Sequence, residues 1–377
     1  MYPALAVLET FNDERSALSL LKGSTLNVLW VGSESGVEAE LVKREGVPFE
    51  AIPAAGVHGV GLRALPVNTW KLSRGLAASR QILRRFRPDV LLFTGGYVAV
   101  PMALAARLPG QRRPKSLLYV PDIEPGLALK TLARFADTIA LTGDDSRAYF
   151  PRHRSVTVTG YPVRQGLKNL EVNQACNVFG LSADLPVLLV MGGSSGARSI
   201  NRALVAVLPE LLPEMQIIHL SGKLDWPEVE AAQKGLSPEL ADRYHAYPYL
   251  HEEMGAAFSA SDLILCRAGA SSLGELPLFG LPAILVPYPY AWRYQRVNAD
   301  YLAKRGAAIV VQDAELAAEI LPTVRELMQN RQRRTQMRLA MQSLARPEAA
   351  ASIATLLNTL AQGLASNSSQ AKEITHG

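Results

Sequence analysis

The chain has 377 residues, with 39 Lys and Arg against 34 Asp and Glu, and a formal net charge of +5. This length exceeds the usual span of one hydrophobic core, so we expect two domains of roughly 150 to 200 residues each. The small positive charge favours an anionic ligand or lipid surface and is too small to indicate a nucleic-acid-binding protein. Cys176 and Cys266 form neither a CxxC pair nor a disulfide framework, which indicates a reducing, cytoplasmic compartment.

The chain starts on an apolar helical segment, residues 2–11, with no strand or glycine turn before it. This segment lacks the basic leader and small-residue cleavage site of a signal peptide. The longest uncharged stretch, residues 90–106, is interrupted by a Gly-Gly pair and by Pro101. We therefore interpret that stretch as a buried strand, a turn and a helix, and not as a membrane span.

Apolar runs with the length of buried strands alternate with helical segments through the first half of the chain. The expected strands are 27–33, 47–52, 89–95, 115–121, 137–142 and 155–160. Residues 69–86 have the clearest helical spacing between them. Alternation of this kind predicts an α/β domain with a parallel sheet.

The same pattern restarts after "GYPVRQGL", near residue 161. The expected strands of the second half are 186–193, 215–222, 244–249, 262–269, 282–289 and 306–312. Residues 314–362 are mostly helical by pattern. The polar segment 362–377 has little apolar surface to bury, so we expect it to be a disordered tail. The boundaries predicted are 1–160 for the first domain, 161–345 for the second, and 346–377 for a C-terminal helix and tail.

Residues 188–204, "LLVMGGSSGARSINRAL", combine a buried strand, a turn with three glycines, and a helix. Such a turn exposes backbone N–H groups and a positive helix terminus, which suit a diphosphate. It is not a P-loop, because no Gly-Lys-Ser/Thr follows, and the GxGxxG fingerprint is absent. An ordinary tight turn between strand and helix is the alternative interpretation.

A second candidate site is "CRAGASSLGELPLFGLPAILVPYP", residues 266–289. Its strand ends near Gly269, and the helix that follows carries Glu275 in its first turn. A carboxylate there can accept two hydrogen bonds from the hydroxyls of a ribose, while exposed N–H groups face phosphate. Alternatively, Ser272 caps the helix and Glu275 completes a capping box.

Two further turns follow expected strands of the first half. Residues 93–101, "FTGGYVAVP", lie where open α/β sheets bind ligands. In "YVPDIEPGLALK", residues 119–130, Asp122 and Glu124 precede a helix, either as helix caps or as a catalytic base. The six histidines are scattered and no metal-ligand cluster is present, so we expect neither a metal nor a cofactor.

Residues 56–87 carry several basic side chains and no acidic one. We interpret this stretch as a loop and a helix with a basic flank, suited to anionic lipid headgroups. A solvated helix face is the alternative.

Six motifs together carry a family resemblance: "YPALAVL", "GGYVAVP", "GYPVR", "GGSSGARSINRAL", "CRAGASSLGELPLFGLPAILVPYP" and "YQRVNADYLAKRGAA". With these motifs in order along nearly its whole length, the chain resembles the bacterial MurG family. Its members transfer N-acetylglucosamine from UDP-GlcNAc to lipid I and so make lipid II for peptidoglycan. The resemblance implies an α/β GT-B fold, two Rossmann-like domains with parallel sheets facing a central cleft. It also implies a peripheral enzyme on the cytoplasmic face of the membrane, acting in cell-wall synthesis, cell shape and division.

The resemblance further implies that the second domain binds UDP-GlcNAc. The positions that match the family's donor-binding residues are Arg164, Ser194, His251, Ala270, Ser271, Ser272, Leu273, Gly274, Glu275 and Gln295. Glu275 is expected on the ribose hydroxyls, Gln295 near the sugar, and His251 at a backbone contact to uracil. The first domain would take the undecaprenyl-linked acceptor, lipid I, with residues 56–87 near anionic lipid of the inner leaflet.

The chain departs from the family at two places. Met1 stands where the family has a valine preceded by a strand and a "GGTGGH" loop, whose histidine is proposed to be catalytic or substrate-positioning. Either a valine codon has been taken as the start, which we favour, or the first strand and turn are lost; mass spectrometry of the native N-terminus separates the two. The family's "HEQN" reads "YVPD" at 119–122, which leaves Asp122 or Glu124 as the expected base.

Three functions fit these motifs. The first is transfer with inversion to lipid I, which requires a positioned hydroxyl, a base and positive potential at the diphosphate. The second is transfer of a UDP-sugar to another lipid or small molecule. The third is UDP-sugar binding without catalysis.

Overall fold

The computed structural model describes residues 1–12, 26–33, 38–54, 65–110, 112–167, 169–193, 196–290 and 294–373. The chain divides into two compact units. Unit 1 comprises Met1–Pro121, Pro125–Pro162 and Glu348–Gly377, and unit 2 comprises Asp122–Glu124 and Val163–Pro347. Within the described residues, no helix is both long enough and apolar enough to cross a bilayer.

The described strands of unit 1 form two parallel sheets. The first pairs β1 (Trp30–Ser33) with β2 (Phe49–Ile52), and the second has the order β3-β4-β5-β6. The strands of this second sheet are β3 (Val90–Phe93), β4 (Lys115–Val120), β5 (Thr138–Leu141) and β6 (Val156–Val158). The helical elements of unit 1 are α1 (Tyr2–Asn12), α2 (Glu38–Arg44), α3 (Leu65–Phe86), α4 (Ala99–Ala105), α5 (Leu127–Leu132), the 3-10 helix η2 (Asp144–Tyr149) and α15 (Ala349–Glu373).

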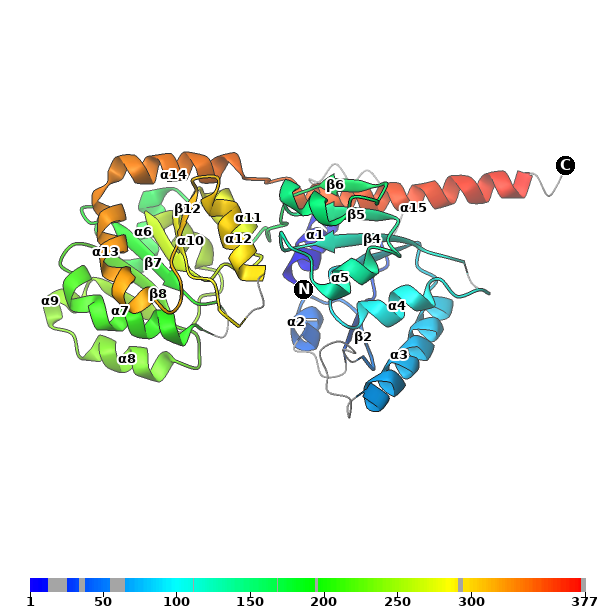
Figure 1. The fold of residues 1–377 in the computed structure, drawn as a ribbon, viewed down its shortest axis with the longest axis horizontal. Helices are drawn as coiled ribbons and strands as arrows, with labels where there is room; N and C mark the ends of the chain where they lie inside the picture. The colour runs from blue at the N-terminus through cyan, green and yellow to red at the C-terminus, as the bar shows by residue number, and fades with distance from the viewer. Residues whose placement is uncertain are drawn as a thin grey trace. The chain divides into compact units, whose positions relative to one another are not determined.

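The core of unit 1 lies between the sheet β3–β6 and the helices α3, α4 and α5. Leu118 and Val120 alternate along β4 and are fully buried in this core. Helix α15 packs along α1 and against β3 and β4 (Figure 1). Helix α15 runs to Glu373, past the residue at which the sequence predicted a tail, and residues 374–377 lie outside the described residues.

A hollow of about 1340 Å³ lies inside unit 1, lined by residues of α1, β1, β3 and α15. Among the described residues, β1 pairs only with β2, and β3 pairs only with β4. Each of these two strands therefore has one side without a strand partner in the described part of the chain.

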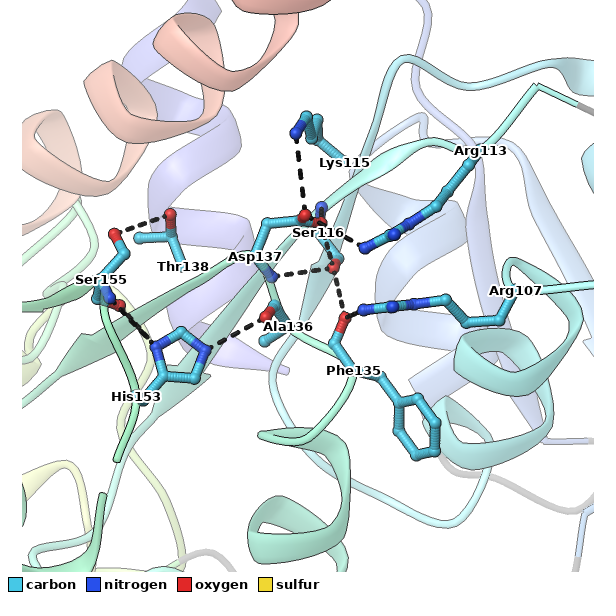
Figure 2. Close-up of polar contacts among 10 residues, drawn as sticks. All are labelled: Arg107, Arg113, Lys115, Ser116, Phe135, Ala136, Asp137, Thr138, His153 and Ser155. Atoms are coloured by element: carbon cyan, nitrogen blue, oxygen red, sulfur yellow. Dashed lines mark hydrogen bonds and ion pairs between the residues drawn. The ribbon is translucent and has the colours of Figure 1, made fainter. Parts of the chain in front are cut away.

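A polar cluster ties together the amino ends of β4, β5 and β6 (Figure 2). The Asp137 carboxylate accepts hydrogen bonds of 2.9 Å from both the N–H and the hydroxyl of Ser116, and it pairs with Arg113 at 3.2 Å. The ring of His153 lies within hydrogen-bond distance of the carbonyls of Ser155 and Ala136. Because ligands of open parallel sheets bind at the carboxyl ends of the strands, we assign this cluster a structural role.

Unit 2 holds one parallel sheet with the order β12-β11-β10-β7-β8-β9. Its strands are β7 (Val187–Met191), β8 (Gln216–Leu220), β9 (Tyr244–Tyr247), β10 (Leu263–Cys266), β11 (Ala283–Leu285) and β12 (Ala308–Val310). Its helices are α6 (Val172–Phe179), α7 (Arg198–Leu211), α8 (Trp226–Lys234), α9 (Pro238–Ala241), α10 (Met254–Ala260), α11 (Ser272–Phe279), α12 (Tyr294–Ala303), α13 (Leu316–Gln329) and α14 (Arg331–Ser343).

Helices cover both faces of this sheet (Figure 1). Along β7, Leu188 and Val190 face a core built with α7 and α13, whereas Leu189 faces a core built with α6, α10 and α11. Burial of both faces explains why these strands read as continuous apolar runs in the sequence.

The strand order reverses direction between β7 and β10. From β7 the chain passes through α7 to β8 on one side, and from β10 it passes through α11 to β11 on the other. The two strands are direct neighbours, with Met191 opposite Cys266 at their carboxyl ends. Such a reversal opens a crevice at the carboxyl ends of the strands, which is where open α/β sheets bind ligands.

Each of the twelve segments expected to be strands contains one of the strands β1 to β12, and residues 69–86 lie within helix α3. The α/β class and the parallel sheets expected from the sequence are confirmed.

Candidate active site

The first glycine turn joins β7 to α7 at the strand reversal. Gly192 is required there because a Cβ at this position would lie 2.3 Å from the N atom of Ala197. Gly196 has φ +81°, and a Cβ on it would lie 2.4 Å from the carbonyl oxygen of Ser221. The turn is therefore tight and directs the N-terminus of α7 at the crevice. Ser194, expected near the diphosphate, lies outside the described residues.

The second glycine turn joins β10 to α11 and lies beside the first. The hydroxyl of Ser272 donates to the carbonyl of Gly269 at 2.6 Å, and the N-cap residue of α11 is Ser271, with no side-chain cap hydrogen bond. The alternative interpretation in which Ser272 caps the helix is therefore wrong. Ala270, Leu273 and Gly274 belong to this same turn and first helical turn. Since α7 begins at the neighbouring turn, two helix N-termini meet at the crevice.

Glu275 lies in the first turn of α11, as the sequence indicated. Burial raises the pKa of its carboxyl group, while a hydrogen bond with Ser271 and the positive charge of Arg164 act in the opposite direction. The structure thus brings Glu275, Ser271 and Arg164 together although Arg164 is distant in sequence. A carboxylate in this position accepts hydrogen bonds and cannot donate them while it is ionised.

Arg267 follows β10 directly and joins four elements at the crevice. Its guanidinium donates to the Val286 carbonyl at 3.1 Å, to the Asp313 carboxylate at 2.5 Å and to the Ser199 hydroxyl at 2.8 Å. Ser199 donates in turn to Asp313 at 2.7 Å. Only 10% of the Arg267 side chain is exposed. It therefore fixes the start of α7 against the ends of β11 and β12.

Gln295 and His251 each contact a residue nearby in the chain. The Gln295 side-chain oxygen accepts a hydrogen bond from the N–H of Tyr288 at 2.9 Å, which fixes the loop after β11 to the first turn of α12. His251 is exposed, and its ring meets that of Tyr249 edge to face, with ring centroids 4.7 Å apart. The backbone N–H of His251 donates to the carboxylate of Glu253 at 3.4 Å.

Asp122 belongs to unit 2 and is linked to the second glycine turn by the side chain of Asn298. The amide of Asn298, on α12, donates to Asp122 at 2.8 Å and to the Ala268 carbonyl at 3.2 Å, and its oxygen accepts from the N–H of Ile123 at 3.0 Å. Burial raises the pKa of Asp122, against the lowering effect of the Asn298 hydrogen bond. Glu124 is also buried.

Asp122 and Glu124 both precede the N-cap residue of the helix that follows them. The N-cap residue of α5 is Gly126, with no side-chain hydrogen bond. Neither carboxylate therefore stands at the N-cap position of α5, and Asp122 contacts Asn298.

The arrangement provides backbone N–H groups and two helix N-termini for an anion, and carboxylates for hydroxyl groups and for proton transfer. Within the described residues, no three His, Cys, Asp or Glu side chains are grouped closely enough to hold a metal ion.

Sequence reasoning assigned no role to Arg267, Asn298 or Asp313. A signal existed for Arg267, a charged residue directly after a buried strand at the edge where ligands bind. A weaker signal existed for Asn298, which is fully buried between apolar residues of a helix. Nothing local indicated that Asp313 pairs with Arg267.

Comparison with known proteins extends these observations to the whole chain. Residues 187–353 match the glycosyltransferase family 28 C-terminal domain, and residues 1–141 match the glycosyltransferase family 28 N-terminal domain.

The chain is 42% identical to the UDP-N-acetylglucosamine--N-acetylmuramyl-(pentapeptide) pyrophosphoryl-undecaprenol N-acetylglucosamine transferase of Roseiflexus sp. (strain RS-1), over 96% of this chain and 92% of that protein. It is 38% identical to the transferase of the same name from Desulforudis audaxviator (strain MP104C), over 96% and 95% of the two chains. Among solved structures, MurG of Acinetobacter baumannii superposes with a TM-score of 0.72 at 27% identity, over 95% of each chain.

Proposed function

The chain belongs to glycosyltransferase family 28, and from this premise we propose that it transfers N-acetylglucosamine from UDP-GlcNAc to a lipid-linked N-acetylmuramyl-pentapeptide acceptor. Its curated relatives are named for this reaction. The product would be lipid II of peptidoglycan synthesis, as the family resemblance implies.

The observation that carries the proposal is the meeting of two glycine turns at the strand reversal of unit 2. A diphosphate there would receive hydrogen bonds from exposed N–H groups and favourable potential from the N-termini of α7 and α11. Glu275, in the first turn of α11, would accept from the ribose hydroxyls. Arg164, whose charge acts on Glu275, would lie on the same side of the donor, and Gln295 near its sugar.

In the proposed reaction, an acceptor hydroxyl attacks C1 of N-acetylglucosamine from the face opposite the diphosphate. The new C1–O bond forms, the bond from C1 to the diphosphate breaks, and UDP leaves with the electron pair. Potential from the two helix N-termini stabilises the negative charge that develops on the leaving diphosphate. Inversion at C1 follows from attack on the opposite face.

Asp122 is our candidate for the base that takes the proton from the acceptor hydroxyl. Its burial raises its pKa above that of an ordinary aspartate, which brings its basicity closer to working pH. Asn298 holds its carboxylate at 2.8 Å and contacts the Ala268 carbonyl, beside the second glycine turn. Glu124 is the second candidate, two residues along the chain.

Incubation of the purified protein with UDP-GlcNAc and lipid I tests the proposal. Release of UDP together with a product heavier by one N-acetylglucosamine supports it. A glycosylated product with another lipid or small molecule, and none with lipid I, indicates a different acceptor. Binding of UDP-GlcNAc in calorimetry without any turnover indicates a sugar-nucleotide-binding protein that is not an enzyme.

We also propose that unit 1 takes the acceptor and binds anionic lipid of the inner leaflet through α3, as a peripheral protein on the cytoplasmic face. On this helix Trp70 is 58% exposed, and the guanidinium of Arg74 lies 4.9 Å from the centre of its ring. Lys71 and Arg84 are exposed on the same helix. An exposed tryptophan among basic side chains suits the headgroup region of a bilayer. Residues 56–64 of the basic stretch lie outside the described residues. Helix α3 begins directly after them, at Leu65.

Flotation with vesicles containing phosphatidylglycerol tests this role of α3. Replacing Lys71, Arg74 and Arg84 by Gln should release the protein from the vesicles. Replacing Arg331, Arg333 and Arg338 of α14 by Gln removes the same charge from unit 2 and serves as the matched control. Equal flotation of the two variants would contradict the assignment.

A further inference from the structure

A buried polar network in unit 2 links strand β9 to the first glycine turn. It consists of Tyr244 on β9, His219 on β8, Asn201 on α7 and Asp225, which precedes α8. The hydroxyl of Tyr244 lies 2.6 Å from Nδ1 of His219, and Nε2 of His219 lies 3.0 Å from the side-chain oxygen of Asn201. All four residues are at most 6% exposed. None of the four takes part in the contacts of Glu275, Arg267 or Asp122 at the crevice.

The hydrogen bonds determine the tautomer of His219. The Asn201 amide nitrogen donates to the Ser221 carbonyl at 2.8 Å and to the Asp225 carboxylate at 2.9 Å. The Asn201 oxygen must therefore face His219 as an acceptor, so Nε2 of His219 carries the proton. Nδ1 is then without a proton and accepts from the Tyr244 hydroxyl. Burial lowers the pKa of His219 to about 3, so the ring stays neutral at physiological pH.

The network ends on the carbonyl that supports the glycine turn. A Cβ at Gly196 would lie only 2.4 Å from the Ser221 carbonyl oxygen, so the turn rests directly on this carbonyl. Asn201 holds the same carbonyl and belongs to the first turn of α7, whose N-terminus faces the crevice. Asp225 also pairs with Arg198, the first residue of α7, at 3.0 Å. The network thus fixes both the turn and the start of the helix.

We propose that Tyr244 and His219 are positioning residues for the donor diphosphate, and that they act by fixing the Asn201 amide and, through it, the Ser221 carbonyl beneath Gly196. The inference rests on the proposed function, in which the first glycine turn binds this diphosphate. It adds His219, one strand away from β7, and Tyr244, two strands away from β7. Neutral, fully hydrogen-bonded side chains are suited to this role, because they hold a single arrangement without competing for the anion.

The substitution Tyr244→Phe tests the mechanism at its far end. Without the hydroxyl, Nδ1 of His219 loses its donor inside the core. A change of tautomer does not restore a partner to either ring nitrogen of His219. The unprotonated Nε2 would then face the Asn201 oxygen, which is also an acceptor. Rotation of the Asn201 amide would relieve that repulsion and withdraw its donors from Ser221 and Asp225.

The expected result is a KM for UDP-GlcNAc raised about five- to tenfold with kcat within about twofold of the wild-type value, the pattern of lost ground-state binding. Tyr247→Phe is the matched control, because Tyr247 lies on the same strand and its hydroxyl is outside the network. Hydrogen exchange of the peptide 196–201 should be faster in Tyr244→Phe and unchanged in Tyr247→Phe. Asn201→Asp keeps the acceptor, removes both amide donors, and should raise KM and exchange by a second route.

Three outcomes are decisive. A KM and an exchange rate in Tyr244→Phe equal to those of Tyr247→Phe would overturn the inference. A fall in kcat at constant KM would also overturn it, because the network would then act on the chemical step. If the wild-type protein does not bind UDP-GlcNAc at all, the proposed function fails, while hydrogen exchange still decides whether the network holds the turn.

Discussion

Replacing Arg267 by Lys keeps the positive charge and removes the planar fork that joins four elements of unit 2. The Arg267 side chain makes three hydrogen bonds, to Val286, Asp313 and Ser199. A lysine ammonium keeps the attraction to Asp313 but cannot reproduce the forked geometry that also reaches Ser199. Loss of one hydrogen bond to a charged group costs about 1.5 to 3 kcal/mol.

The expected loss in the free energy of unfolding is therefore about 2 kcal/mol for Arg267→Lys. Little discount for solvent screening is needed, because the side chains of Arg267 and Asp313 are only 10% and 21% exposed. For a domain of this size, about 2 kcal/mol lowers Tm by roughly 4 to 8 °C. Arg267→Met should cost more, about 3 to 5 kcal/mol, because it leaves Asp313 buried without a partner charge.

Urea unfolding followed by hydrogen exchange of peptides from unit 2 measures this loss separately from unit 1. Arg202→Lys is the control, because Arg202 pairs with Glu228 on the surface and the two side chains are 61% and 49% exposed. That change should shift the unfolding free energy by less than about 0.5 kcal/mol. If Arg267→Lys and Arg202→Lys unfold at the same urea concentration, the Arg267 contacts do not carry the stability assigned to them.

Further predictions concern three carboxylates, those of Glu275, Asp122 and Asp137. Glu275→Gln should weaken UDP-GlcNAc binding about 10- to 100-fold in calorimetry. The same change should raise Tm near neutral pH, because burial raises the pKa of Glu275: the fold favours the protonated acid, and stability is lost as pH rises from 4.5 through the raised pKa. Asp122→Asn should lower kcat about 10²- to 10⁴-fold and abolish the fall of kcat at acidic pH. In the wild type this fall should lie above the ordinary pKa range of an aspartate, because burial raises the pKa of Asp122. An unchanged dependence of kcat on pH would exclude Asp122 as the base. Asp137→Ala should destabilise unit 1 by about 1 to 3 kcal/mol in calorimetric unfolding, because the N–H of Ser116 loses its acceptor while the Ser116 hydroxyl keeps only the Phe135 carbonyl. Asp89→Ala, which breaks an exposed ion pair, should change the unfolding free energy by less than about 1 kcal/mol.

The sequence predicted the strands well because both faces of these parallel sheets are buried. Continuous runs such as "VLLVM" at β7 and "LILC" at β10 are distinct from the helices around them. The prediction of a tail after residue 362 relied on the lack of apolar residues there, whereas helix α15 is drawn to Glu373. Polar composition alone does not determine whether a helix that is already formed continues.

The site was predictable in its parts and not in its assembly. The two glycine turns and Glu275 are visible as local patterns. Their adjacency depends on β7 pairing with β10, and strand order is set by packing across the whole unit. Arg267 and Asp313 are 46 residues apart, and Asn298 is 176 residues from Asp122, so these contacts have no local signature.

The hollow of unit 1 has a consequence for how the protein opens. A two-stranded parallel sheet such as β1–β2 is marginally stable unless other elements bury its faces and edges. Both β1 and β3 line the hollow, and neither has a strand partner on its other side among the described residues. Local opening should therefore begin in the segment that contains β1, α2 and β2, at a free energy well below that of global unfolding. A protease should therefore cleave this segment faster than it cleaves the strands of the sheet β3–β6.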